Sequence, residues 1–102
     1  MSPPFFIAFG HYMKTVDLVY PEQDPEDLLY EACDVLHLIP RDMGTLKRYP
    51  GSRHWHFSKA RQSGVLECTW WPLGHRFWIY VAKHRDACWI ENAMQDLKAR
   101  LG

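Results

Sequence analysis

Three stretches between residues 53 and 82 alternate apolar and polar side chains, and no other feature of this sequence restricts the fold as strongly. They are 53–59 (RHWHFSK), 65–71 (VLECTWW) and 76–82 (RFWIYVA). Side chains two positions apart on a β-strand point to the same face of a sheet, so this period of two predicts three strands. Because the connections between them are short, we expect consecutive strands to pair antiparallel.

The register of these strands follows from the four-residue connection between the second and the third, which places Trp71 opposite Arg76. The same ladder pairs Cys68 with Ile79, and an apolar face forms when Trp55 is placed opposite Cys68. That face contains Trp55, Phe57, Leu66, Cys68, Trp70, Phe77, Ile79 and Val81. A slip of one residue would expose this set and bury the histidines, so the pattern predicts a single register.

The opposite face of the predicted sheet gathers residue types that bind ligands more often than they fill a core. The register gives it one row of His56, Glu67 and Tyr80, and a second row of His54, Thr69 and Trp78. The predicted ligand-binding residues are His54, His56, Glu67, Thr69, Trp71, Arg76, Trp78 and Tyr80. No other candidate site stands out in the chain.

Two helices are predicted, one before the three strands in the sequence and one after them. The first spans 25–39, where Asp24 and Pro25 are typical of a helix start. Its apolar stripe is expected to be Leu28, Ala32, Val35, Leu36 and Ile39. The second spans 87–101 with Asp86 as its cap. Its inward side chains are expected to be Ile90, Ala93, Met94, Leu97 and Leu101.

The remaining segments are a loop over 40–52 and an N-terminal segment, 5–20, whose pattern fits a strand or a helix. With 102 residues, we expect a single domain over 1–102 of the α+β class. It should contain an antiparallel sheet of at least three strands with both helices packed on one face.

Charge is balanced in total but divided along the sequence. Residues 1–43 hold eight acidic residues against Lys14 and Arg41, whereas residues 44–102 hold ten basic residues against four acidic ones. Within 44–85 the single acid is Glu67. A basic second half is compatible with an anionic partner.

The three cysteines, Cys33, Cys68 and Cys88, form no Cys-x-x-Cys spacing and cannot all pair within one chain. We therefore expect reduced cysteines and a cytoplasmic location. The N-terminal residues lack the basic leader and the long apolar run of a signal peptide or a membrane span, so no membrane association is expected.

Binding hypotheses come first for the polar face. An aromatic patch on a small domain favours a protein partner or a homodimer. The alternative is single-stranded RNA, whose bases would stack on Trp71, Trp78 and Tyr80. The basic residues expected to contact the RNA phosphates are Arg53, Lys59, Arg61 and Arg76.

A hydrolytic or metal-dependent enzyme is the third hypothesis. His56 beside Glu67 would form an acid–base pair, with the carboxylate raising the imidazole pKa, and Tyr80 would assist. For a metal, the candidate ligands are His54, His56 and Glu67, two imidazoles and a carboxylate. No cofactor is expected.

Two partial resemblances accompany the enzyme hypothesis. His56-Phe57-Ser58 is similar to one half of the paired His-x-Ser/Thr signature of two-histidine phosphoesterases, but no other histidine of the chain is followed by Ser or Thr at that spacing. The order of a helix, three strands and a helix, with Gly51-Ser52 before a strand that carries histidines, is similar to toxin ribonucleases of the HicA type. Neither identifies a family, and a binding module, not an enzyme, is the preferred hypothesis.

Overall fold

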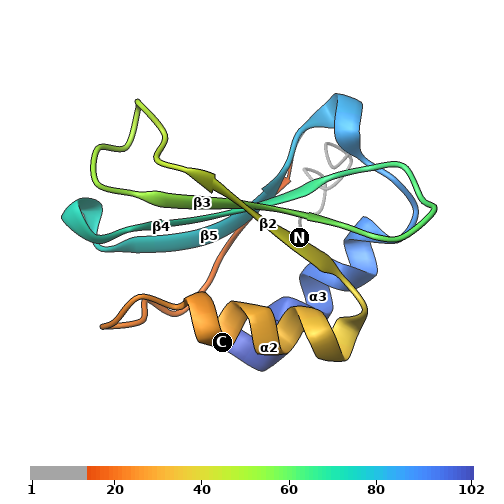
Figure 1. Cartoon of the computed structure of the whole chain (residues 1–102), viewed down its shortest axis with the longest axis horizontal. Helices are drawn as coiled ribbons and strands as arrows, with labels where there is room; N and C mark the ends of the chain where they lie inside the picture. Colours follow the sequence, from red (N-terminus) through yellow and green to blue (C-terminus); the bar gives the residue numbers. More distant parts are fainter. Residues whose placement is uncertain (1–13) are drawn as a thin grey trace, which may run out of the picture.

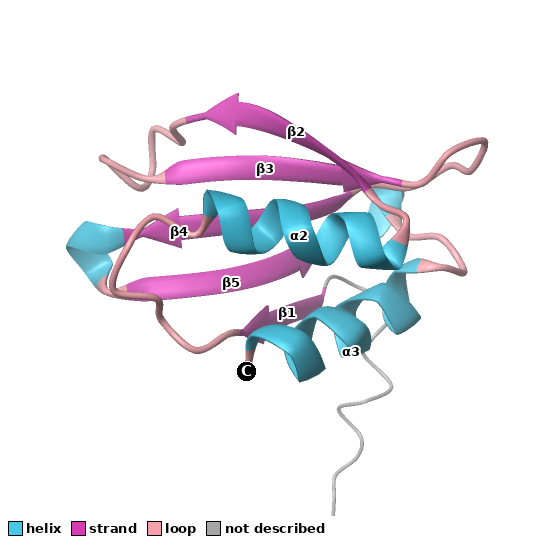
Figure 2. Ribbon diagram, turned by 60° about the horizontal axis from the view of Figure 1, so that its bottom comes forward, coloured by secondary structure: helices cyan, strands magenta, loops and turns pink. Residues whose placement is uncertain are grey.

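The computed structural model describes residues 14–102 and consists of a five-stranded antiparallel sheet with two helices on one of its faces (Figures 1 and 2). The strands lie side by side in the order β1, β5, β4, β3, β2. In chain order the elements are β1 (Lys14–Asp17), α2 (Glu26–Leu36), β2 (Ile39–Gly44), β3 (Arg53–Ser58), β4 (Leu66–Trp71), β5 (Arg76–Val81) and α3 (Ile90–Leu101). Short 3-10 turns occupy Pro72–Gly74 and Lys83–Arg85. The expected α+β class is confirmed.

The predicted register is confirmed in both central hairpins. Trp55 lies opposite Cys68, and Cys68 lies opposite Ile79. On the other face, the two predicted rows form as expected: His56, Glu67 and Tyr80 in one, and His54, Thr69 and Trp78 in the next.

The core lies between the sheet and the helix layer. Trp55, Phe57, Leu66, Cys68 and Ile79 are fully buried on the helix-facing side of the sheet. The helices cover them with Leu29, Ala32 and Cys33 from α2 and with Ile90, Ala93, Met94 and Leu97 from α3. Neither helix within residues 14–102 is long and apolar enough to cross a membrane.

The predicted end of the first helix was wrong, and its predicted face was right only for Ala32, which is buried, and Leu36, which is partly buried. Leu28, Val35 and Ile39 are about half exposed, and the buried face instead runs through Leu29 and Cys33. The helix ends at Leu36, because His37 takes a left-handed conformation, and the N–H groups of His37 and Leu38 donate to the carbonyls of Asp34 and Cys33. A stripe through Cys33 fits the three- and four-residue helical spacing as well as the predicted one, and packing against α3 and the sheet selects it.

The predicted loop over 40–52 was wrong for its first part, because Ile39–Gly44 forms β2 and pairs with β3. Pro40 disfavours a strand in the sequence, but β2 is an edge strand, where a missing N–H leaves no partner unpaired. Pro40, Arg41, Asp42 and a register shift before Gly44 are features that protect an exposed sheet edge.

The start of the second helix also differs from the expectation. Asp86 does not cap α3, which begins at Ile90 after Trp89; its carboxylate accepts a hydrogen bond from the Ala87 N–H at 2.8 Å. At the N-terminal end, β1 pairs with β5 along its four residues. The rest of the segment whose pattern fits a strand or a helix, residues 5–13, lies outside the described residues.

Adjacent leucines of α2 test the position of its buried face. Leu29→Ala should lower the free energy of unfolding by about 2–5 kcal/mol, since Leu29 is fully buried in the core. Leu28→Ala, on a side chain that is 46% exposed, should change it by about 0.5 kcal/mol or less. Urea denaturation of both variants measures the difference, and equal destabilisation would contradict the assigned face.

Candidate functional site

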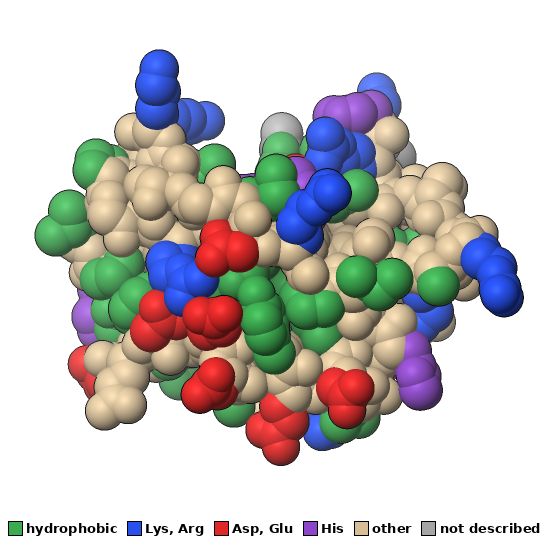
Figure 3. Space-filling model, in the orientation of Figure 1, with side chains coloured by type: hydrophobic (Ala, Val, Ile, Leu, Met, Phe, Trp, Pro, Cys, Tyr) green, Lys and Arg blue, Asp and Glu red, His purple; other side chains and the backbone are tan. Residues whose placement is uncertain are grey.

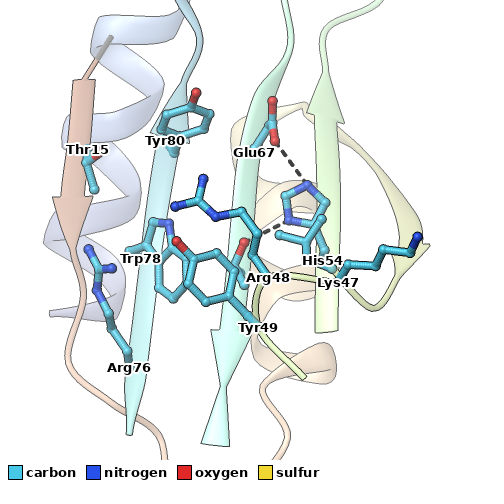
Figure 4. A pocket seen from close by; sticks show the side chains of 11 residues that line it. Thr15, Lys47, Arg48, Tyr49, His54, Glu67, Arg76, Trp78 and Tyr80 are labelled. Carbon is cyan, nitrogen blue, oxygen red and sulfur yellow. Dashed lines mark hydrogen bonds and ion pairs between the residues drawn. The ribbon is translucent and has the colours of Figure 1, made fainter. Parts of the chain in front are cut away.

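The segment 45–52 between β2 and β3 folds back over the sheet face that the helices leave uncovered (Figure 4). Its own hydrogen bonds fix its shape: the Leu46 N–H donates to the buried Ser52 hydroxyl at 3.1 Å, and the Ser52 N–H donates to the Tyr49 carbonyl at 3.0 Å. Gly44 and Gly51 take φ values of +84° and +81° at its two ends, a conformation that few other residues adopt. The segment, named here the cover loop, is therefore a defined structure.

Two contacts with the sheet hold the cover loop in place. The Trp71 indole N–H donates to the Pro50 carbonyl at 3.0 Å. The Tyr49 ring meets Trp71 and Trp78 edge-on, with ring centroids 4.9 and 5.1 Å apart. Edge-on aromatic contacts are a favoured geometry, so Tyr49 anchors the loop on the aromatic part of the face.

The cover loop changes the exposure of the predicted aromatic platform. Trp78 is only 6% exposed, because Tyr49 lies against it and the Arg76 guanidinium lies 4.2 Å from its ring centroid. Trp70, predicted to be core, is by contrast only half-buried at the end of the sheet. The aromatic part of the face, on which RNA bases were expected to stack, is thus covered by the loop.

A cavity of about 480 Å³ lies between the cover loop and the sheet (Figure 4). The cover loop contributes Leu46, Lys47, Arg48 and Tyr49 to its lining. The sheet contributes Thr15, His54, Glu67, Thr69, Arg76, Trp78 and Tyr80. Six of the eight predicted ligand-binding residues therefore line one cavity. Of the other two, Trp71 supports Tyr49, and His56 faces a neighbouring hollow of about 320 Å³ beside β2.

His54, Glu67 and Thr69 form a hydrogen-bonded network on the floor of the cavity (Figure 4). His54 Nε2 lies 3.0 Å from Glu67 Oε1, and His54 Nδ1 lies 2.7 Å from Thr69 Oγ1. A carboxylate only accepts, so in the neutral imidazole Nε2–H donates to Glu67 and Nδ1 accepts the Thr69 hydroxyl proton. The hydrogen bond from His54 lowers the pKa of Glu67, although burial raises it.

The predicted acid–base pair of His56 and Glu67 needs correction. The close partner of Glu67 is the diagonal neighbour His54, whereas His56 Nε2 lies 3.8 Å from Glu67 Oε1. Burial lowers the pKa of His56, and the opposing effect of Glu67 does not compensate. The expected rise in the pKa of His56 was therefore wrong, because burial favours its neutral form.

The basic side chains around the cavity are only in part those predicted. Arg76 lines it and also donates to Asp17 at 3.2 Å. Arg53 was expected beside it, but this side chain points to the helix face and pairs with Asp24, Glu26 and Asp42. Lys59 lies at α2, where its ammonium donates to the Leu36 carbonyl at 3.4 Å.

Lys47 and Arg48 supply the positive charge instead. Neither has a carboxylate partner within residues 14–102. Most acidic side chains in Figure 3 lie over the helix layer, whereas several Lys and Arg side chains project from the sheet side. The cavity is consequently basic at its rim and acidic only at Glu67.

Five lining residues were not predicted as site residues: Thr15, Leu46, Lys47, Arg48 and Tyr49. The turn residues Pro50 and Gly51 just before β3 were the available signal, since they indicate a sharp reversal of the chain. They do not indicate which face of the sheet the preceding residues cover.

No protein-family model, no curated protein and no solved structure gives a significant match to this chain. The function is therefore argued from the geometry of the cavity and its side chains.

Acidification should weaken the fold through this site. The unfolded chain binds a proton on His56 near pH 6.5, whereas burial lowers its pKa in the folded state. The unfolded state thus binds more protons, and the free energy of unfolding falls as the pH drops below about 6.5. Glu67, whose pKa is also lowered, adds a loss of the same sign below about pH 4.5. Urea denaturation between pH 7.5 and 5 should show that the free energy of unfolding falls less steeply with decreasing pH in His56→Gln than in wild type. An identical pH dependence in the two proteins would refute the contribution of His56.

Proposed function

We propose that the protein is a small binding module that takes a nucleoside phosphate into the cavity beneath the cover loop, either as a free nucleotide or as the end of a single-stranded RNA. The cover loop carries this proposal: by folding over the sheet it encloses a cavity lined by aromatic and basic side chains. This surface is the aromatic, histidine and arginine face that the alternation of the strands predicted.

The size of the cavity supports a small ligand or one nucleotide unit. About 480 Å³ lies within the usual range for small-molecule sites, roughly 300–1,000 Å³. A longer RNA would place further nucleotides outside it. Stacking of several bases along the strands is disfavoured, because Trp78 is buried by Tyr49 and Arg76.

The lining side chains suit both parts of a nucleotide, the base and the phosphate. Tyr49 and Tyr80, each half-buried at the cavity, offer ring surface to a base. Lys47 and Arg48 at the rim suit a phosphate, because guanidinium and ammonium groups bind phosphate oxygens through charge-assisted hydrogen bonds. The Glu67 carboxylate can accept a hydrogen bond from an exocyclic amine of a base.

The other functional hypotheses stay predictions. A protein partner or homodimer would find apolar side chains on the outer face of α2, at Leu28 and Val35, and at Leu73. The β2 edge favours such pairing less, owing to Pro40 and its charged neighbours. A strict monomer by light scattering at high concentration would argue against self-association. A cytoplasmic location is still inferred only from the cysteine pattern.

Calorimetric titration of the EDTA-treated full chain with AMP, GMP, CMP and UMP tests the proposal, with inorganic phosphate and a hexanucleotide RNA as further ligands. We expect binding of at least one nucleotide that is tighter than binding of phosphate and that weakens as salt rises. RNA binding far tighter than any mononucleotide would identify an RNA end as the ligand, and similar affinities would favour the free nucleotide.

Arg48→Gln should weaken nucleotide binding about tenfold or more, equivalent to roughly 1.4 kcal/mol. Arg100→Gln, an exposed change of the same charge on α3, is the matched control and should leave affinity unchanged. The proposal fails if no nucleotide or RNA binds at low salt, or if both variants lose the same affinity.

A further inference from the structure

We infer that His54, His56 and Glu67 form a binding site for a divalent first-row transition metal ion such as Zn²⁺ or Fe²⁺. This site goes beyond nucleotide binding and does not depend on it. Within residues 14–102, these three side chains are the group whose metal-ligating atoms all lie within 4.8 Å of one another.

One of the distances already fits a metal, and the others require a movement of His56. Bonds of about 2.1 Å from one ion to nitrogen or oxygen place two neighbouring ligand atoms roughly 3.0–3.4 Å apart. Glu67 Oε1 lies 3.0 Å from His54 Nε2 and 3.8 Å from His56 Nε2. The three ligand atoms lie within 4.8 Å of one another, so the His56 nitrogen has to move closer to the other two, and the His56 side chain is 21% exposed.

The three ligands lie on two internal strands of the sheet, β3 and β4. His54 and His56 are two residues apart on β3, so both imidazoles project from the same face, and Glu67 lies directly opposite His56 on β4. Both strands are internal in the sheet, with partners on each side. A site on such strands keeps its geometry better than one on loops.

Thr69 provides the orienting contact that a metal-bound histidine requires. Its hydroxyl lies 2.7 Å from His54 Nδ1, and both groups are buried. A histidine that binds a metal through Nε2 normally donates its Nδ1–H to a hydrogen-bond acceptor, which fixes the ring and its tautomer. Thr69 can do this because a hydroxyl accepts as well as donates.

The hydrogen bonds of His54, Glu67 and Thr69 therefore suit both the metal-free and the metal-bound state. Without metal, the Thr69 hydroxyl donates to His54 Nδ1, and Nε2–H donates to Glu67. With metal, the ion takes the place of the Nε2 proton between His54 and Glu67, and Nδ1–H donates to Thr69. One proton moves from Nε2 to Nδ1, and the hydroxyl proton of Thr69 turns away.

The charge and composition of the site select the kind of ion. Within residues 14–102, the ion-pair partners of the Glu67 carboxylate are the two histidines and no Lys or Arg. Two imidazoles with one carboxylate suit Zn²⁺ or Fe²⁺ better than Mg²⁺ or Ca²⁺, which prefer oxygen ligands throughout. Three protein ligands leave coordination positions for water or a ligand, and His54 and Glu67 both line the cavity.

Metal binding by the full chain tests the inference. After EDTA treatment and desalting, equilibrium dialysis against Zn²⁺ or Co²⁺ should give one equivalent of bound ion, and Co²⁺ should develop a visible absorption band. His56→Ala and Glu67→Gln should each weaken binding more than tenfold. Thr69→Val, which keeps the shape but removes the hydroxyl, should weaken it about 10–100-fold.

Two controls keep the result interpretable. His84→Ala removes an exposed histidine outside the site, and Cys88→Ser removes the exposed thiol, so both should bind as wild type does. Circular dichroism must show that each variant is folded. Absence of binding in the wild type, or unchanged binding in folded His56→Ala and Glu67→Gln, overturns the inference. Nucleotide titrations in EDTA are unaffected by either outcome, so the two proposals fail separately.

Discussion

The row of Trp55, Cys68 and Ile79 across β3, β4 and β5 is the constraint on which the rest of the structure depends. All three side chains are fully buried beneath the helices, and each lies directly opposite its neighbour in the row. A slip of one residue in either hairpin would turn large apolar side chains to the other face, so the row holds a single register. The opposite face receives His54, His56, Glu67 and Thr69, because these residues alternate with the buried side chains along β3 and β4.

The cover loop then turns that face into a cavity. The buried Ser52 hydroxyl and the Trp71 indole form hydrogen bonds with the backbone of the loop, and the Tyr49 ring of the loop packs on the aromatic side chains of the sheet. Lys47 and Arg48 are adjacent to Tyr49 in the sequence, so anchoring the ring also places their charges at the rim of the cavity. Aromatic packing and the position of positive charge are thus consequences of the same short segment.

The alternation of apolar and polar side chains predicted the strands, their register and six of the cavity-lining residues. The face on which a strand residue lies follows from its position in the sequence, and every cross-strand pair has to agree with the same register. The alternation did not predict β2, since Pro40 disfavours a strand unless the strand is known to lie at an edge. Tyr49 was missed for a different reason: the direction of a loop depends on contacts with residues distant in the sequence, here Trp71 and Trp78. The choice of His54 over His56 as the close partner of Glu67 depends on side-chain rotamers, which the register leaves free.

The position of Tyr49 on the sheet is the central claim, and nuclear Overhauser effects between aromatic protons measure it most directly. With the ring centroids 4.9 and 5.1 Å apart, Tyr49 should give strong cross-peaks to both Trp71 and Trp78 in the free protein. Cross-peaks to neither tryptophan, with Tyr49 chemical shifts close to those of an unfolded chain, would contradict the covered cavity and leave the sheet face open.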